Sequence, residues 1–200
     1  KLNRSGTEYA LKVLKRFSEI LNVSKITNLK IIATAVLREA TDTKPFIDEV
    51  EKLFKTKINI LSGEEEAECS AEGVKIGFEN VDGLVADLGG GSLELARVEN
   101  NIVTNKTSLP VGVLRLMNNP IVKKRNLAKY IKKLLRDEKW ISKKKFNNLY
   151  LVGGTWRALF KLHLFQNNHP VHIIHQYSID NNVLSKFVEK ISSFNKSKLK

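Results

Sequence analysis

An acid-flanked glycine turn constrains the fold of this chain more than any other feature. Residues 84–91 (LVADLGGG) join a short apolar run, which ends in Asp87, to a three-glycine turn. Residues 93–108 then predict two strands that form a hairpin around an Asn-Asn turn. Strands punctuated by glycine turns, each leading to another strand or to a helix, indicate an α/β fold.

The other predicted elements follow the same order. Apolar residues at helical or alternating spacing identify them. The predicted helices span residues 7–22, 34–40, 45–54, 64–78, 127–135, 142–146, 156–164 and 181–194, and the predicted strands span residues 29–33, 58–61 and 149–152. Ser62 and Glu65 fit a capping box before helix 64–78, and Ser5 or Thr7 is expected to cap the first helix.

A change of composition at residues 79–83 predicts a junction between two lobes, residues 1–80 and 81–200. The first lobe offers two short strands, and an isolated pair of strands is only marginally stable in water. We therefore expect further strands to complete its sheet, from chain that precedes Lys1.

The composition limits the kind of protein that this chain can be, but it does not identify a ligand. The 34 Lys and Arg residues against 21 Asp and Glu give a formal net charge of +13, which attracts polyanions such as nucleic acid, nucleotides or inorganic polyphosphate. A general Lys bias of the source proteome would give the same charge, so both explanations stay open. The longest apolar runs are far shorter than the ~20 residues of a membrane helix, and no signal peptide pattern opens the chain. One cysteine, Cys69, excludes an internal disulfide. We expect a cytoplasmic protein without a membrane partner.

The glycine turn has the features of a phosphate site. Three glycines allow positive φ and a close approach of the backbone to a ligand, and successive free N–H groups form an anion nest. Asp87 and Glu94 flank the turn, so both carboxylates can face one Mg²⁺, directly or through water. The alternative explanation is structural, because a tight hairpin needs glycine in any case.

Two further segments suit phosphate chemistry. Residues 151–157 (LVGGTWR) predict a strand, a Gly-Gly turn and a helix whose N-terminus attracts phosphate, although Thr155 is also a good helix cap. Residues 64–68 (EEEAE) place four acids at a helix start, and the helix dipole explains two of them. Consecutive helical residues point about 100° apart, so at least one glutamate should face away from bulk solvent. Its carboxylate could then take a proton from an attacking water. Two phosphate-binding turns and an acid together indicate phosphoryl transfer.

Five ordered motifs resemble the exopolyphosphatase / guanosine pentaphosphate phosphatase (Ppx/GppA) family. They are residues 33–40 (ATAVLREA), 62–67 (SGEEEA), 87–94 (DLGGGSLE), 108–116 (SLPVGVLRL) and 152–159 (VGGTWRAL). The resemblance covers residues 1–194. It implies an actin-like ATPase (ribonuclease H-like) fold, with two lobes and the active site in the cleft between them.

The resemblance also implies roles for single residues. Glu66 corresponds to the base that activates water, and Asp87 and Glu94 would hold Mg²⁺. The residues that would bind phosphate are Gly89, Gly90, Gly91, Ser92, Gly153, Gly154, Thr155 and Arg38. Arg115 matches the family as well, with a role that is either functional or structural. Family likeness also suggests a homodimer.

The chain departs from the family at four places. Leu93 stands where the family usually has Thr, and Trp156 stands where it has a small residue. The family's opening strand with an Asp-x-Gly-(Ser/Thr)-Asn turn does not occur after Lys1, and the end of the second lobe is expected beyond Lys200. We therefore interpret the chain as a fragment of a family member.

Three hypotheses about function remain open at this point. The first is an exopolyphosphatase that removes terminal phosphate from inorganic polyphosphate with Mg²⁺, and the second is removal of the 5′ γ-phosphate of guanosine pentaphosphate. The third is a truncated, non-catalytic remnant that binds polyphosphate or an alarmone. A sugar kinase or chaperone ATPase of the same fold would need an adenosine pocket, for which no motif occurs. No motif for sequence-specific nucleic-acid binding occurs either.

Overall fold

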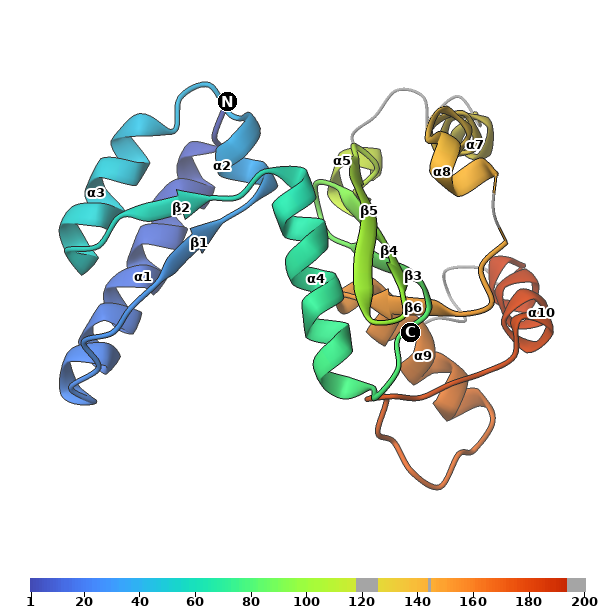
Figure 1. The fold of residues 1–200 in the computed structure, drawn as a ribbon. Coiled ribbons are helices and arrows are strands. Elements are labelled where there is room, and N and C mark those ends of the chain that lie inside the picture. Colours follow the sequence, from blue (N-terminus) through green and yellow to red (C-terminus); the bar gives the residue numbers. More distant parts are fainter. Residues whose placement is uncertain (118–125, 144, 194–200) are drawn as a thin grey trace. The chain divides into compact units, whose positions relative to one another are not determined.

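The computed structural model describes residues 1–117, 126–143 and 145–193. The chain forms two compact units, Lys1–Leu151 and Val152–Lys200 (Figure 1). The lobe boundary predicted near residue 80 lies inside the first unit and stays a prediction.

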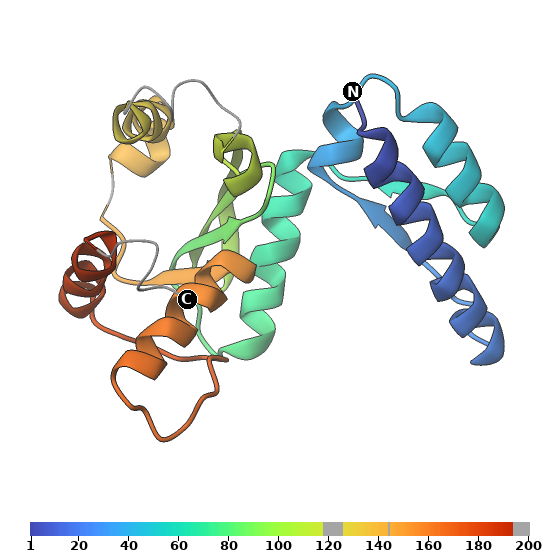
Figure 2. The same cartoon turned by 180° about the vertical axis from the view of Figure 1, so that it is seen from behind.

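The first unit begins with helices around a two-stranded parallel sheet. Its elements are α1 (Arg4–Val23), β1 (Ile31–Ala33), α2 (Ala35–Glu39), α3 (Lys44–Phe54) and β2 (Ile58–Ile60). β1 pairs with β2, and α1 lies along β1 on one face of the two strands (Figures 1 and 2). The helix cap predicted at Ser5 or Thr7 is wrong. Asn3 caps α1, because its side-chain oxygen accepts a hydrogen bond from Gly6 N.

A four-stranded sheet forms the rest of the first unit. Its elements are α4 (Gly63–Gly77), β3 (Gly83–Leu88), β4 (Leu93–Glu99), β5 (Ile102–Leu109), α5 (Val113–Met117), α7 (Leu127–Asp137), α8 (Lys139–Ser142) and β6 (Leu149–Val152). The strand order is β5-β4-β3-β6, and β3, β4 and β5 are antiparallel neighbours. The predicted hairpin is confirmed. Asn100 and Asn101 have φ of 50° and 63°, the left-handed conformations of a two-residue hairpin turn.

Side chains of this sheet alternate between its two faces. A hydrophobic cluster on one face consists of Ala86, Leu95, Leu109 and Val111. Apolar residues of α7 and α8 pack against this cluster. Asp87 and Lys106 belong to the other face, where they bond to Ser70 and Glu68 of α4. Strand alternation therefore separates an apolar face under α7 and α8 from a face under α4 that combines buried apolar residues, such as Val85 and Ala96, with the polar side chains.

The second unit contains α9 (Gly154–Gln166) and α10 (Asn181–Ser192). Leu164 and Phe187 are buried in it, and the ring of His163 packs edge-on against Phe187 at 4.8 Å between centroids. His163 Nδ1 also lies 3.1 Å from the hydroxyl of Tyr177. His163 therefore belongs to the packing of this unit.

One helix was predicted in the wrong place. Residues 145–146 are not helical, and α8 instead ends at Ser142. The apolar pair Trp140 and Ile141 packs on the hydrophobic cluster of the sheet, so burial of these two side chains decides where the helix forms. Cys69 is exposed on α4. Across the three described ranges, no helix has the length and apolar character needed to span a membrane.

Candidate active site

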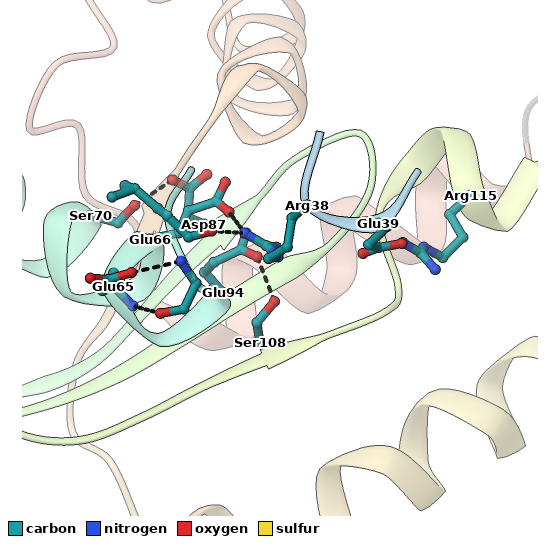
Figure 3. Close-up of polar contacts among 11 residues, drawn as sticks. Arg38, Glu39, Glu65, Glu66, Ser70, Asp87, Glu94, Ser108 and Arg115 are labelled. Atoms are coloured by element: carbon teal, nitrogen blue, oxygen red, sulfur yellow. Dashed lines mark hydrogen bonds and ion pairs between the residues drawn. The ribbon is translucent and has the colours of Figure 1, made fainter. Parts of the chain in front are cut away.

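Three polar side chains form a row on the face of the sheet that α4 covers. Asp87 in β3 is the register partner of Glu94 in β4, and Glu94 is the register partner of Ser108 in β5. Directly opposed residues of antiparallel strands point to the same side. Ser108 Oγ donates to Glu94 Oε1 at 2.7 Å, and Ser70 Oγ donates to Asp87 Oδ2 at 2.6 Å (Figure 3). Two serine hydroxyls therefore orient the two carboxylates.

The three glutamates at the start of α4, residues 64–66, have different environments. The predicted capping box is confirmed, because Ser62 Oγ accepts from Glu65 N at 3.1 Å and Glu65 Oε2 accepts from Ser62 N at 2.7 Å. Glu64 is exposed, whereas the side chain of Glu66 is only 20% exposed to solvent. The expectation that one glutamate faces away from solvent is confirmed. Ser70 follows Glu66 by one turn, so both lie on the same side of α4.

Arg38 of α2 holds the carboxylate of Glu66. Its Nη1 donates to Glu66 Oε2 at 3.0 Å and to the main-chain oxygen of Leu61 at 2.7 Å (Figure 3). The Arg38 side chain is 22% exposed, so this charge-assisted bond is largely shielded from water. Among the described residues, Glu66 Oε1 has no hydrogen-bond partner. One oxygen of Glu66 is thus fixed by Arg38 and the other is available to a water molecule.

Glu94 is the most buried charged group of the site, with 2% of its surface exposed. Burial raises the pKa of Glu94 above 4.5, the hydroxyls of Ser92 and Ser108 act in the opposite direction, and the carboxylates of Glu66 and Asp87 raise the pKa further. The negative charges of Glu66 and Asp87 therefore both act on the carboxyl group of Glu94.

This set of carboxylates fits Mg²⁺, the ion that the family resemblance implies. Mg²⁺ binds proteins through one or two carboxylates, keeps several waters and takes its other ligands from substrate phosphates. Asp87 and Glu94 offer two carboxylates on one face, and a divalent cation would offset their repulsion. Within the described part of the chain, no group of three or more His, Cys, Asp or Glu side chains is arranged to hold an ion alone.

The peptide groups of the glycine turn are oriented through their carbonyl oxygens. The bonds are Val113 N to Gly89 O at 3.1 Å, Leu114 N to Gly90 O at 2.9 Å and Gly112 N to Gly91 O at 3.2 Å. A planar trans peptide holds its C=O and N–H on opposite sides. The N–H groups of Gly90, Gly91 and Ser92 therefore point away from α5, and within residues 1–117, 126–143 and 145–193 none of them has an acceptor. Three neighbouring N–H groups that point one way form an anion nest.

Close packing requires glycine most strictly at Gly112, which lies against the backbone of this turn. None of residues 89–91 has the positive φ that glycine allows. A Cβ on Gly112 would lie 2.4 Å from Gly90 C and 2.2 Å from Gly91 C, and a Cβ on Gly91 would lie 3.0 Å from Ala35 Cβ. Glycine is needed because two backbone segments touch.

The second glycine turn belongs to the second unit. Gly153 has φ of 109° and ψ of 166° and precedes α9 without a side-chain cap. The prediction that Thr155 caps this helix is wrong, because Thr155 lies within its first turn. Gly154 and Thr155 are exposed. Phosphate binding by Gly153, Gly154 and Thr155 stays a prediction.

The sequence did not predict Ser108 as the partner of Glu94. If residues are paired one by one from the Asn-Asn turn, Thr107 lies opposite Glu94. A register shift between Arg97 and Val98 makes Ser108 the partner instead. The departure at Leu93 has a packing role, because its side chain lies against the hydrophobic cluster of the sheet.

Comparisons with known proteins assign the chain to a family. The family model described as "Ppx/GppA phosphatase family" matches residues 1–200. A guanosine-5'-triphosphate,3'-diphosphate pyrophosphatase of Aeromonas hydrophila is 36% identical over 120 residues, which cover 60% of this chain and 24% of that protein. A bifunctional 3-dehydroquinate synthase/phosphatase of Fusobacterium nucleatum is 29% identical over 212 residues, which cover 96% of this chain and 32% of that protein. The chain thus spans a third or less of the length of these curated relatives.

Solved structures establish the fold. An exopolyphosphatase from Cytophaga hutchinsonii has a TM-score of 0.75 and 22% identity, with 85% of this chain and 58% of that chain covered. A Ppx/GppA family member from Aquifex aeolicus has a TM-score of 0.71 and 20% identity, with 99% and 66% covered. The predicted α/β fold of the actin-like ATPase type is confirmed. Because the family model matches the whole sequence, the chain belongs to the Ppx/GppA phosphatase family.

Proposed function

We propose that this chain carries the phosphate-binding turn and the water-activating carboxylate of an exopolyphosphatase, which hydrolyses the terminal phosphoanhydride bond of inorganic polyphosphate. Its family consists of phosphatases. The single observation that carries the proposal is the orientation of the glycine turn, whose amides at Gly90, Gly91 and Ser92 have no acceptor among the described residues.

In this proposal the glycine turn binds phosphate and Glu66 transfers the proton. The three amides bind oxygens of the terminal phosphate. Glu66 accepts a proton from the attacking water through the carboxylate oxygen that Arg38 does not hold. Arg38 keeps the other oxygen in place and adds a positive charge next to the phosphate oxygens. Positioning and charge stabilisation account for most catalysis in phosphoryl transfer.

Asp87 and Glu94 hold Mg²⁺ in this proposal. When bound, the ion neutralises charge on the phosphate oxygens during hydrolysis. Ser70 and Ser108 keep the two carboxylates pointed to one side of the sheet.

The relatives favour one alternative substrate. The Aeromonas hydrophila relative is named for guanosine-5'-triphosphate,3'-diphosphate, so removal of the 5′ γ-phosphate of guanosine pentaphosphate is the second candidate. It would use the same turn and the same carboxylate, because both substrates end in a phosphoanhydride.

Phosphate release from each substrate, with Mg²⁺ and with EDTA, tests the proposal. We expect release from polyphosphate with Mg²⁺ and a loss of at least about 100-fold with EDTA. A large preference for guanosine pentaphosphate would assign the second candidate. Substrate binding without any release would instead support a non-catalytic remnant and would refute hydrolysis.

A further inference from the structure

Arg115 contacts the back of the glycine turn with both its main chain and its side chain. Its main-chain N donates to Gly90 O at 3.2 Å, and its Nε donates to Gly91 O at 2.7 Å. Its Nη2 donates to Glu39 Oε2 at the end of α2 (Figure 3). One arginine therefore joins two successive peptide groups of the turn to a carboxylate 76 positions away in the chain.

The bond to Gly91 O has a defined effect on the turn. The carbonyl of Gly91 and the N–H of Ser92 belong to the same planar peptide group, so fixing one fixes the other. Arg115 Nε at 2.7 Å, with the main-chain N of Gly112 at 3.2 Å as a second donor to the same oxygen, thereby sets the direction of the Ser92 N–H. The Gly90 N–H is set differently, because its peptide carbonyl, Gly89 O, accepts from the main-chain N–H of Val113.

Glu39 determines where the guanidinium of Arg115 lies. The two side chains are partly shielded, with exposed fractions of 43% and 33%. Glu39 follows Arg38, which holds Glu66. Two adjacent residues of α2 thus reach two parts of the site, the carboxylate that activates water and the arginine behind the turn.

We propose that Arg115 is a positioning residue for phosphate binding, which aims the Ser92 amide at a phosphate oxygen, and that Glu39 fixes Arg115 for this task. The proposal rests on the function proposed above. It assigns Arg115 no contact with substrate, because the role rests on the bonds of Nε to the turn and of Nη2 to Glu39.

Amide NMR spectra during titration with tripolyphosphate test this proposal. In the wild type we expect the amide signals of Gly90, Gly91 and Ser92 to shift. In Arg115→Lys, which keeps the charge but loses the fixed geometry of two donors, affinity should fall about tenfold. The shift at Ser92 should shrink most and the shift at Gly90 least. Arg4→Lys is the matched control, because Arg4 uses its Nε in an exposed pair with Glu8, and its affinity should equal that of the wild type.

A charge exchange separates positioning from simple stabilisation. Arg115→Glu combined with Glu39→Arg can restore an ion pair, but it removes the donor to Gly91 O. We expect unfolding temperature to recover relative to Arg115→Glu alone while tripolyphosphate affinity stays low. Recovery of both would overturn the positioning role.

The two proposals fail in different ways. If the wild-type amides do not respond to tripolyphosphate, the proposed function is wrong at its phosphate site. Amide spectra without ligand then still judge Arg115: Arg115→Lys should change the chemical shift of the Ser92 amide more than that of the Gly90 amide, and equal spectra would refute the role of Arg115. If the wild type responds and Arg115→Lys binds equally well with the same shift at Ser92, the phosphate site stands and the role of Arg115 is refuted.

Discussion

The two glycine turns of this chain look alike in sequence and differ in backbone conformation and in the space around their glycines. Residues 89–91 form a turn without positive φ, pressed against the backbone of Gly112. Gly153 has φ of 109°, and a Cβ on Gly154 would meet nothing within 4 Å. The first turn requires glycine at position 112, which packs on it, for space, and the second requires glycine at position 153 for backbone conformation. A shared motif can therefore hide two different requirements, and substitutions should separate them.

Gly112→Ala should have the largest effect. Its methyl group would overlap the backbone of Gly90 and Gly91, which cannot move aside as a flexible side chain would. We expect a loss of about 3 kcal/mol or more in the free energy of unfolding, measured with urea. Gly73→Ala on the exposed side of α4, where nothing lies within 4 Å, should instead stabilise by about 1 kcal/mol. A neutral Gly112→Ala would contradict the close contact.

Gly153→Ala should have an intermediate effect. Positive φ strains any residue with a Cβ, at a cost of about 1–3 kcal/mol. Calorimetric unfolding of the variant measures this cost. A result as severe as that of Gly112→Ala would mean that the two turns do not differ as described.

The pH dependence of stability should distinguish the first turn, which has Glu94 beside it. Burial raises the pKa of Glu94 in the folded state. The folded protein then holds its proton more tightly than the unfolded chain, so the free energy of unfolding falls as pH rises from 4.5 through this raised pKa. In metal-free buffer, Glu94→Gln should flatten this decline. An unchanged profile would show that Glu94 is not the group responsible.

Gly154→Ala should have the smallest effect. Gly154 lies in the first turn of α9, is exposed, and has open space around its Cα. Alanine restricts the unfolded chain, so we expect stabilisation by about 0.5 kcal/mol. Destabilisation by more than 1 kcal/mol in thermal unfolding would reveal a contact at Gly154 that the described residues do not include.

Local signals predicted most of the fold. The capping box of Ser62 and Glu65, the Asn-Asn hairpin and the shielding of one glutamate in residues 64–66 follow from residues that are close in sequence, whereas the choice of Glu66 came from the family resemblance. The contacts of Gly112 with Gly91 and of Arg115 with Glu39 join distant segments, and spacing alone cannot predict them. The bulge between β4 and β5 is a similar case, because one extra residue in β5, Thr104, changes the partner of Glu94 from Thr107 to Ser108.

Phosphate release by Glu66→Gln tests the central claim most directly. Glutamine keeps the size of the side chain and an oxygen for Arg38, but it cannot accept the proton of an attacking water. We expect hydrolysis of polyphosphate to fall by at least about 100-fold while tripolyphosphate binding stays within about threefold of the wild type, since binding depends on the amides of residues 90–92. Glu64→Gln, which changes an exposed neighbour on the same helix, should hydrolyse at the wild-type rate. Equal turnover by Glu66→Gln and Glu64→Gln would contradict the account.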